Sequence, residues 1–144
     1  MRVVIQKVTY SSVTVDNKLI NEINDGLNVL VGFTEGDSSK EIDYMVKKIA
    51  NLRIFDDENG VMNKSVLDIG GEVLLISQFT LYGDAKKGNR PSYIRALNGE
   101  KSSPLYDEMA DKLNKIVPTK KGIFGADMKL VIHNDGPATI IIES

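Results

Sequence analysis

Apolar and polar residues alternate, or form short apolar runs, over much of the chain, and this pattern predicts a β-rich protein. Val3, Ile5 and Val8 alternate loosely within residues 2–8, and residues 12–15, 19–23 and 27–33 continue a β-type pattern with turn residues between them. Alternation with a period of two places one set of side chains on one face of a strand. We therefore expect these segments to form an N-terminal antiparallel meander.

Two later segments carry apolar residues at helical spacing. Ser38 and Glu41 match a capping box, which marks the start of a helix, and an apolar stripe then continues to about Asn51 (Ile42, Met45, Val46 and Ile49). Ser103-Pro104 is expected to start a second helix with proline at its first position. The apolar stripe of that second helix is Leu105, Met109, Leu113 and Ile116. Both stripes predict core packing.

Residues 73–76 form a continuous apolar run, as in a strand covered on both faces. The run leads directly into Ser77, Gln78 and Thr80. Polar groups at the end of a buried strand need partners, so we expect the rim of a site at this point.

A second notable stretch, His133-Asn134-Asp135-Gly136-Pro137-Ala138-Thr139, lies between the apolar runs 128–132 and 140–142. Asp-Gly between such runs predicts a hairpin turn, because glycine accepts the positive φ that the turn needs. Pro137 has no backbone N–H and is tolerated at a strand edge, where Gly136-Pro137 can also present two carbonyl oxygens without a side chain. An ordinary turn and a carbonyl-presenting turn both remain open.

Length and composition predict a single domain, residues 1–144, of ordinary globular character, with 42% hydrophobic and 26% charged residues. The expected fold is α/β, bordering on α+β: a three-layer β/β/α domain in which mixed, largely antiparallel sheet layers carry two amphipathic helices on one side. The chain has no cysteine and one histidine, which excludes disulfides, thiolate zinc sites and His-rich metal sites. No apolar run approaches membrane-spanning length and no signal peptide precedes the first strand, so we expect a cytoplasmic protein.

Few residues offer catalytic chemistry. His133, beside Asn134 and Asp135, fits either a general base or a surface residue at a strand end, and the Thr80 hydroxyl would need an adjacent base to act as a nucleophile. The acidic turn 56–60 lacks the ligand spacing of a calcium loop.

With a net charge of −2, contacts to phosphate require a local patch. The segment 84–95 contains such basic residues and is either a phosphate-binding loop or a solvated one (Lys86, Lys87, Arg90 and Arg95).

Two motifs together resemble the paired signature of the D-aminoacyl-tRNA deacylases: Ser77-Gln78-Phe79-Thr80-Leu81 and Asn134-Asp135-Gly136-Pro137-Ala138-Thr139. The likeness extends over essentially all 144 residues. That family hydrolyses the ester that joins a D-amino acid to the terminal adenosine of tRNA, and it also acts on glycyl esters. The resemblance implies a cytoplasmic homodimeric hydrolase that proofreads aminoacyl-tRNA. We expect no cofactor and assign no metal-ligating residue, and metal dependence stays open.

The resemblance also implies roles for individual residues. Gly136-Pro137 would be a cis peptide that one subunit inserts into the partner's pocket, where its carbonyl oxygens hold the substrate and exclude L-amino acids. The backbone N–H groups of Phe79 and Thr80 would stabilise the oxyanion, and the 2′-hydroxyl of the terminal adenosine would help to activate water. The remaining expected contacts are pocket ordering by Ser77 and Gln78, adenine contacts by Phe124 and Met128, and tRNA backbone contacts by Lys86, Lys87 and Arg90.

Two residues depart from the family pattern. Ala138 replaces the usual valine, and Lys7 replaces the usual arginine, so a single ammonium stands in place of a planar fork of donors. A relaxed deacylase that also accepts small L-amino acids is therefore one alternative. A catalytically silent protein that binds the tRNA 3′ end is another, and a structural domain that dimerises through the expected hairpin is a third.

Overall fold

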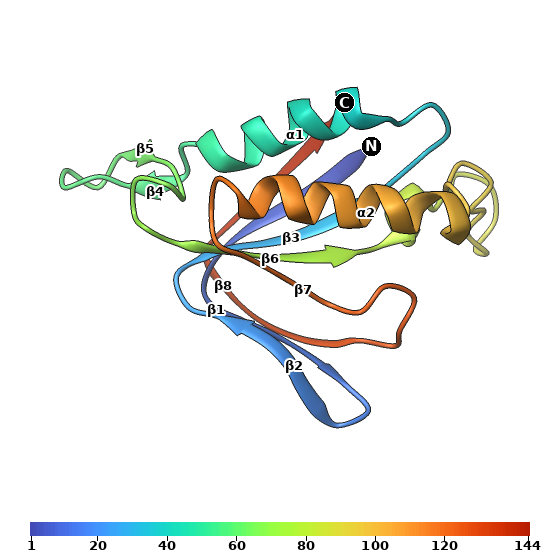
Figure 1. Cartoon of the computed structure of the whole chain (residues 1–144), viewed down its shortest axis with the longest axis horizontal. Helices are drawn as coiled ribbons and strands as arrows, with labels where there is room; N and C mark the ends of the chain where they lie inside the picture. The colour runs from blue at the N-terminus through green and yellow to red at the C-terminus, as the bar shows by residue number, and fades with distance from the viewer.

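The computed structural model describes residues 1–144 and consists of a curved sheet with two helices on one side (Figure 1). The helices are α1 (Ser39–Asn51) and α2 (Gly99–Asn114), and a short 3-10 turn, η1 (Phe79–Tyr82), follows the sixth strand. The strands are β1 (Arg2–Val15), β2 (Lys18–Ile23), β3 (Gly26–Gly32), β4 (Phe55–Asp56), β5 (Met62–Lys64), β6 (Glu72–Ser77), β7 (Thr119–Lys121) and β8 (Lys129–Glu143).

The main sheet has the order β2-β1-β3-β6-β7, and β8 pairs along the other side of β1. The pairs β3–β6 and β6–β7 are parallel, with α1 and α2 in the respective connections, whereas β1 pairs antiparallel with β2, β3 and β8. The expected mixed, largely antiparallel sheet with two helices on one side is confirmed. Neither helix has both the length and the hydropathy that crossing a membrane requires.

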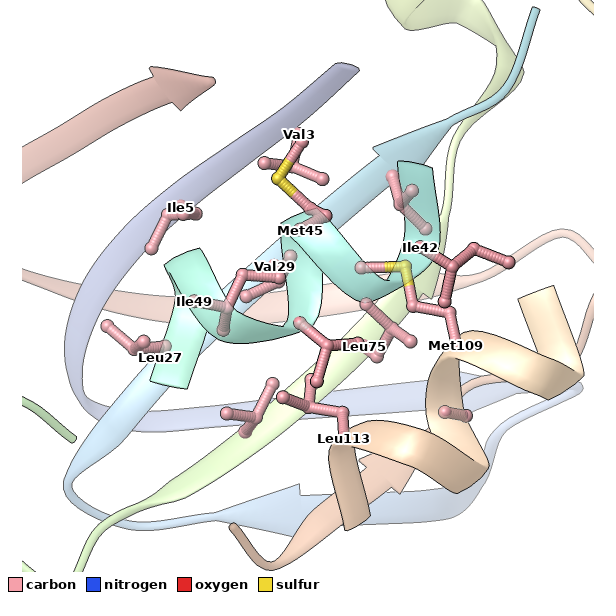
Figure 2. Close-up of a cluster of buried hydrophobic side chains, with 14 of the residues drawn as sticks. Val3, Ile5, Leu27, Val29, Ile42, Met45, Ile49, Leu75, Met109 and Leu113 are labelled. Carbon is pink, nitrogen blue, oxygen red and sulfur yellow. The ribbon is translucent and has the colours of Figure 1, made fainter. Parts of the chain in front are cut away.

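The larger core fills the space between the helices and the sheet. Figure 2 shows apolar side chains from α1, α2 and the strands meeting in this layer, among them Met45, Met109 and Leu75. The predicted stripe of α1 (Ile42, Met45, Val46 and Ile49) is fully buried, and Ser38 and Glu41 form the predicted capping box. The sequence therefore identified this helix and its buried face correctly.

A smaller core lies on the opposite face of β3 and β6, against β8 and the second half of β1. Along β6, Val73 and Leu75 belong to the helix-side core, whereas Leu74 and Ile76 belong to the second one. The strand is thus covered on both faces, as its continuous apolar run predicted. Together the two cores make the three β/β/α layers.

The N-terminal meander was a wrong prediction. β1 is one strand of 14 residues, long enough to pair with two strands in turn along the same side. β3 pairs with its first half, Arg2–Val8, and β2 pairs with its last residues, Ser11–Val15, so β2 and β3 are not neighbours. Tertiary pairing, rather than chain order, decides this arrangement.

The start of α2 was also predicted wrongly. The helix begins at Gly99, and Asn98 caps it by accepting a hydrogen bond from the Lys101 N–H at 3.0 Å. Pro104 lies inside the helix, on its exposed side. Tyr106 occupies a buried position, and its hydroxyl donates to Leu75 O at 2.6 Å, whereas Ile116 lies beyond the helix end and is exposed.

Candidate functional site

A cavity of about 780 Å³ lies where the parallel strands β3 and β6 end. In Figure 1 the arrowheads of β3 and β6 point toward the same side of the molecule. The Gln78 N–H donates to Val31 O at 2.7 Å, which continues the strand pairing to the edge of the cavity. The carboxyl ends of adjacent parallel strands are a common position for ligand sites.

Five of the predicted site residues line this cavity together: Ser77, Gln78, Phe79, Phe124 and Met128. Ser77 ends β6, and Gln78 and Phe79 directly follow it. Phe124 and Met128 come from the connection between β7 and β8. Residues almost fifty positions apart in the sequence therefore meet around one space.

The other predicted residues do not line the cavity. Thr80 lies next in η1 and is exposed, and the loop residues Lys86, Lys87 and Arg90 are exposed between η1 and α2. Gly136 and Pro137 are also exposed and lie outside the lining of the chain's own cavity.

Sequence reasoning missed part of the wall, namely Asn98, Gly99 and Ser102 at the start of α2. They were missed because the helix start was placed too late in the chain. The signal that identifies them is Asn98 itself, since asparagine is a preferred N-cap residue. The apolar floor, which comprises Leu30, Ile76, Leu130 and Ile132, was likewise not predicted.

The 3-10 turn η1 presents backbone donors beside the cavity. Gln78 is its N-cap residue but makes no side-chain cap hydrogen bond, so the first amides of the turn, those of Phe79 and Thr80, lack that acceptor. Gly32 lets the turn pack closely over β3, because a Cβ there would lie 2.9 Å from Gln78 O. Arg2 Nη1 donates to Leu81 O at 2.6 Å and holds the turn from the other end.

Aromatic side chains lie on two sides of the cavity. The rings of Phe79 and Tyr93 meet edge to face with centroids 5.2 Å apart, and Phe79 is 57% exposed. Phe124 is half-buried and packs against Tyr106, with centroids 5.8 Å apart. Burial raises the pKa of Tyr106 far above its ordinary value, so this tyrosine stays protonated and keeps its bond to the sheet. Apolar and aromatic walls with a few polar groups are typical of small-molecule sites.

The stretch around Gly136 and Pro137 is a loop inside one strand, so the predicted hairpin was wrong. β8 pairs with β1 on both sides of the loop, with Asn134 opposite Val8 and Thr139 opposite Gln6. The four residues 135–138 thus stand against the single residue Lys7. The Gly136-Pro137 peptide bond is cis, and Gly136 has a φ of +106°. Apolar residues on both sides of the loop face the same partner strand, which a hairpin turn would not allow.

Polar side chains hold the base of this loop. Asn134 Nδ2 donates to Lys7 O at 3.0 Å and to Ala138 O at 3.1 Å. Thr139 Oγ1 lies 3.0 Å from Pro137 O, and Lys7 Nζ lies 3.6 Å from Asp135 Oδ2. Lys7 is itself 7% exposed, so its ammonium makes one ion pair at the loop from a nearly buried position.

No strong base faces the cavity. Asp127 is the one carboxylic acid in its lining, and it pairs with Lys129 at 3.2 Å. His133 is exposed, packs against Tyr10 with ring centroids 5.3 Å apart, and lies outside the lining. No group of three or more His, Cys, Asp or Glu side chains is placed to hold a metal ion. The cavity offers backbone donors and apolar walls.

The chain is similar to known proteins over its whole length. The family model described as D-Tyr-tRNA(Tyr) deacylase matches residues 4–143. Proteins named D-aminoacyl-tRNA deacylase from Clostridium acetobutylicum and Clostridium tetani are 53% and 55% identical to it, respectively, and each comparison covers 100% of this chain and 97% of the relative.

Solved structures agree with this similarity. The structure titled c-Myc DNA Unwinding Element Binding Protein is 44% identical, with a TM-score of 0.95 over 100% of this chain and 99% of the other. A probable eukaryotic D-amino acid tRNA deacylase is 18% identical, with a TM-score of 0.83 over 98% of this chain and 97% of the other, and it supports the fold alone. The chain belongs to the D-Tyr-tRNA(Tyr) deacylase family.

Proposed function

We propose that this protein hydrolyses the ester bond of D-aminoacyl-tRNA, and also that of glycyl-tRNA, and that it releases the free amino acid. The observation that carries the proposal is the placement of the family's Ser77-Gln78-Phe79 segment at the rim of a cavity beside uncapped backbone amides. The family to which the chain belongs gives the reaction class.

In the proposed reaction, water attacks the ester carbonyl carbon, and the carbonyl oxygen becomes an oxyanion. The N–H groups of Phe79 and Thr80 donate to this oxygen; losing one such donor typically costs about 2.7–4 kcal/mol of transition-state stabilisation. Collapse of the intermediate breaks the bond to the 3′-oxygen of the terminal adenosine, and that oxygen takes up a proton. The substrate's own 2′-hydroxyl assists the attacking water, which agrees with the lack of a strong base in the cavity lining.

We assign the binding residues by their position. Gln78 and Ser77 order the pocket, and Phe124 and Met128 contact the terminal adenine. Gly122 supports that wall, because a Cβ there would lie 2.6 Å from Met128 Sδ. The exposed Lys86, Lys87 and Arg90 contact the tRNA backbone.

The loop 135–138 acts in the pocket of a second copy of the chain, in a homodimer. Gly136 and Pro137 are exposed and do not line the chain's own cavity, so a partner is needed to bring them to one. β8 is a sheet edge of 15 residues that carries the exposed apolar residues Val131 and Ile141; such an edge favours association. A two-fold dimer would give each cavity the partner's loop.

A release assay tests the activity. Purified protein is expected to liberate free tyrosine from D-tyrosyl-tRNA much faster than from L-tyrosyl-tRNA. A silent protein that binds the tRNA 3′ end would protect the ester, and a relaxed deacylase would hydrolyse esters of small L-amino acids as well. Protection of the ester would exclude catalysis, and hydrolysis of the small L-amino acid esters would show that the loop does not exclude L-amino acids in this protein.

Mixed dimers test the exchange of loops between subunits. Gly136→Ala damages the loop and Gln78→Ala damages the cavity, so each variant alone is expected to be weakly active. A mixed dimer has one site that combines an intact cavity with an intact partner loop, and co-expression is expected to restore hydrolysis. If no activity returns although mixed dimers form, each cavity uses its own chain's loop.

A further inference from the structure

A row of polar side chains crosses three adjacent strands below the loop 135–138. Ser11 Oγ donates to Asn28 Oδ1 at 2.9 Å, and Asn28 Nδ2 donates to Gln6 Oε1 at 3.2 Å. Gln6 Nε2 in turn lies 3.5 Å from Asn134 Oδ1. Ser11 and Asn28 are completely buried. A buried amide is costly unless it is paired, so the row needs an explanation.

The sheet register brings these side chains together. Gln6 of β1 stands opposite Asn28 of β3 on one side and opposite Thr139 of β8 on the other. Side chains directly opposite each other on neighbouring strands share a face. The next residue of β3 on that face is Leu30, which lines the cavity. The polar row therefore lies between the floor of the cavity and the base of the loop.

Two backbone carbonyl oxygens identify the donor and the acceptor of every hydrogen bond in the row. The Asn134 side chain faces two carbonyl oxygens, Lys7 O and Ala138 O, which can only accept. Its NH₂ must therefore point at them, and its oxygen faces both Gln6 Nε2 and the Thr139 hydroxyl, which donates to it at 3.1 Å. Gln6 then donates to Asn134 and accepts from Asn28, and Asn28 accepts from the Ser11 hydroxyl. All four groups donate toward the loop.

We infer that Asn28 is a positioning residue for the Gly136-Pro137 loop, and that it acts through Gln6 and Asn134. Asn28 is completely buried and presents a donor to Gln6, so the Gln6 amide is held with its own donor toward Asn134. Asn134, at one end of the loop, then binds Ala138 O at the other end and Lys7 O of the facing strand β1. The inference rests on the proposed function, in which the placement of this loop decides the discrimination between D- and L-esters.

The double variant Ser11→Ala/Asn28→Leu tests this role against the single variant Ser11→Ala. Leucine can neither donate nor accept at any pH, and removing the Ser11 hydroxyl in both proteins avoids leaving it unpaired. The measurement is the ratio of kcat/KM for D-tyrosyl-tRNA to that for L-tyrosyl-tRNA. Both substrates are hydrolysed by the same folded molecules, so a loss of folded protein cancels in the ratio.

We expect the ratio to fall by about tenfold or more on adding Asn28→Leu, since this is the effect of one lost orienting hydrogen bond to a buried group. The single variant Ser11→Ala is expected to keep the parent ratio, because Asn28 still donates to Gln6. An unchanged ratio in a folded double variant would overturn the inference. An equal loss in both variants would also overturn it, because that result would point to packing rather than to donor direction.

Gln6→Glu provides a second test that leaves the buried residues intact. The introduced carboxylate can accept from Asn28 but offers only oxygen to Asn134, so Asn134 Oδ1 loses the Gln6 donor and faces a second acceptor in its place. The D/L ratio is expected to fall here too, and this variant decides the question if the double variant does not fold. Gly136→Ala distinguishes a failure of the proposed function from a failure of this inference. If Gly136→Ala also keeps the parent D/L ratio, then the proposed role of the loop fails, rather than the role of Asn28.

Discussion

Replacing Gly136 with alanine is the most direct test of the loop. Gly136 has a φ of +106°, a conformation that an L-residue adopts at a cost of about 1–3 kcal/mol. A Cβ at this position would also lie 3.1 Å from Ala138 N, which is closer than an ordinary contact. The loop is exposed and stands out from the strand, so it can relax to a different conformation rather than keep this strain.

If hydrolysis needs the parent conformation of the loop, Gly136→Ala lowers the fraction of molecules in that conformation by a factor that this strain energy sets. We therefore expect kcat/KM for D-tyrosyl-tRNA to fall by about 5- to 160-fold, since each 1.36 kcal/mol is about a factor of ten. The free energy of unfolding in urea should fall by no more than about 1–3 kcal/mol. Release of tyrosine under single-turnover conditions measures the first quantity, and a urea titration measures the second.

Gly60→Ala is the matched control. Gly60 also has a positive φ, +73°, and no heavy atom lies within 4 Å of the Cβ position, but it belongs to the exposed turn between β4 and β5. The Gly60→Ala variant should lose free energy of unfolding of the same order as Gly136→Ala and keep the parent kcat/KM. Parent kcat/KM in Gly136→Ala would refute the assigned role of the loop, and an equal loss of activity in Gly60→Ala would show that the effect is not specific to it.

Three further predictions concern the turn, the basic loop and the first helix. Thr80→Val should keep kcat within about threefold, because no base is placed to activate the hydroxyl and the backbone donor is retained; a loss of several hundredfold would make the hydroxyl essential. Charge reversal at Lys86, Lys87 and Arg90 should raise KM for aminoacyl-tRNA and reduce the slope of log KM against log salt concentration by about 0.7–0.9 per lost phosphate contact. Hydrolysis of a D-tyrosyl adenosine ester should stay unaffected, and equal effects on both substrates would refute a contact with the tRNA backbone. The Ser38 hydroxyl, followed by the Ser38 N–H, holds the pKa of Glu41 below its ordinary value of 4.5. The stabilisation that the Glu41 carboxylate contributes is therefore complete above about pH 4.5 and is lost as the pH falls through the lowered pKa. Glu41→Gln should remove this contribution from the pH dependence of the free energy of unfolding, and an unchanged pH profile would contradict the prediction.

Local sequence determined the elements whose signals lie within a few residues. The capping box at Ser38 and the apolar spacing after it define α1, because capping and helical periodicity are local properties. The continuous run 73–76 identified β6 as a strand buried on both faces. The same pattern predicted the rim of a site at Ser77, Gln78 and Thr80, because polar residues directly follow a buried strand; Ser77 and Gln78 line the cavity, whereas Thr80 does not.

Only the tertiary structure decided how distant segments combine. The runs on either side of Gly136 are typical of a hairpin, but both pair with β1, since a partner of 14 residues satisfies their backbone groups along its length. Phe124 and Met128 reach the cavity because parallel pairing of β6 with β7 directs the next connection to that edge. The row from Asn28 to Asn134 is set by cross-strand register, which no local pattern encodes, because the partners are far apart in the chain.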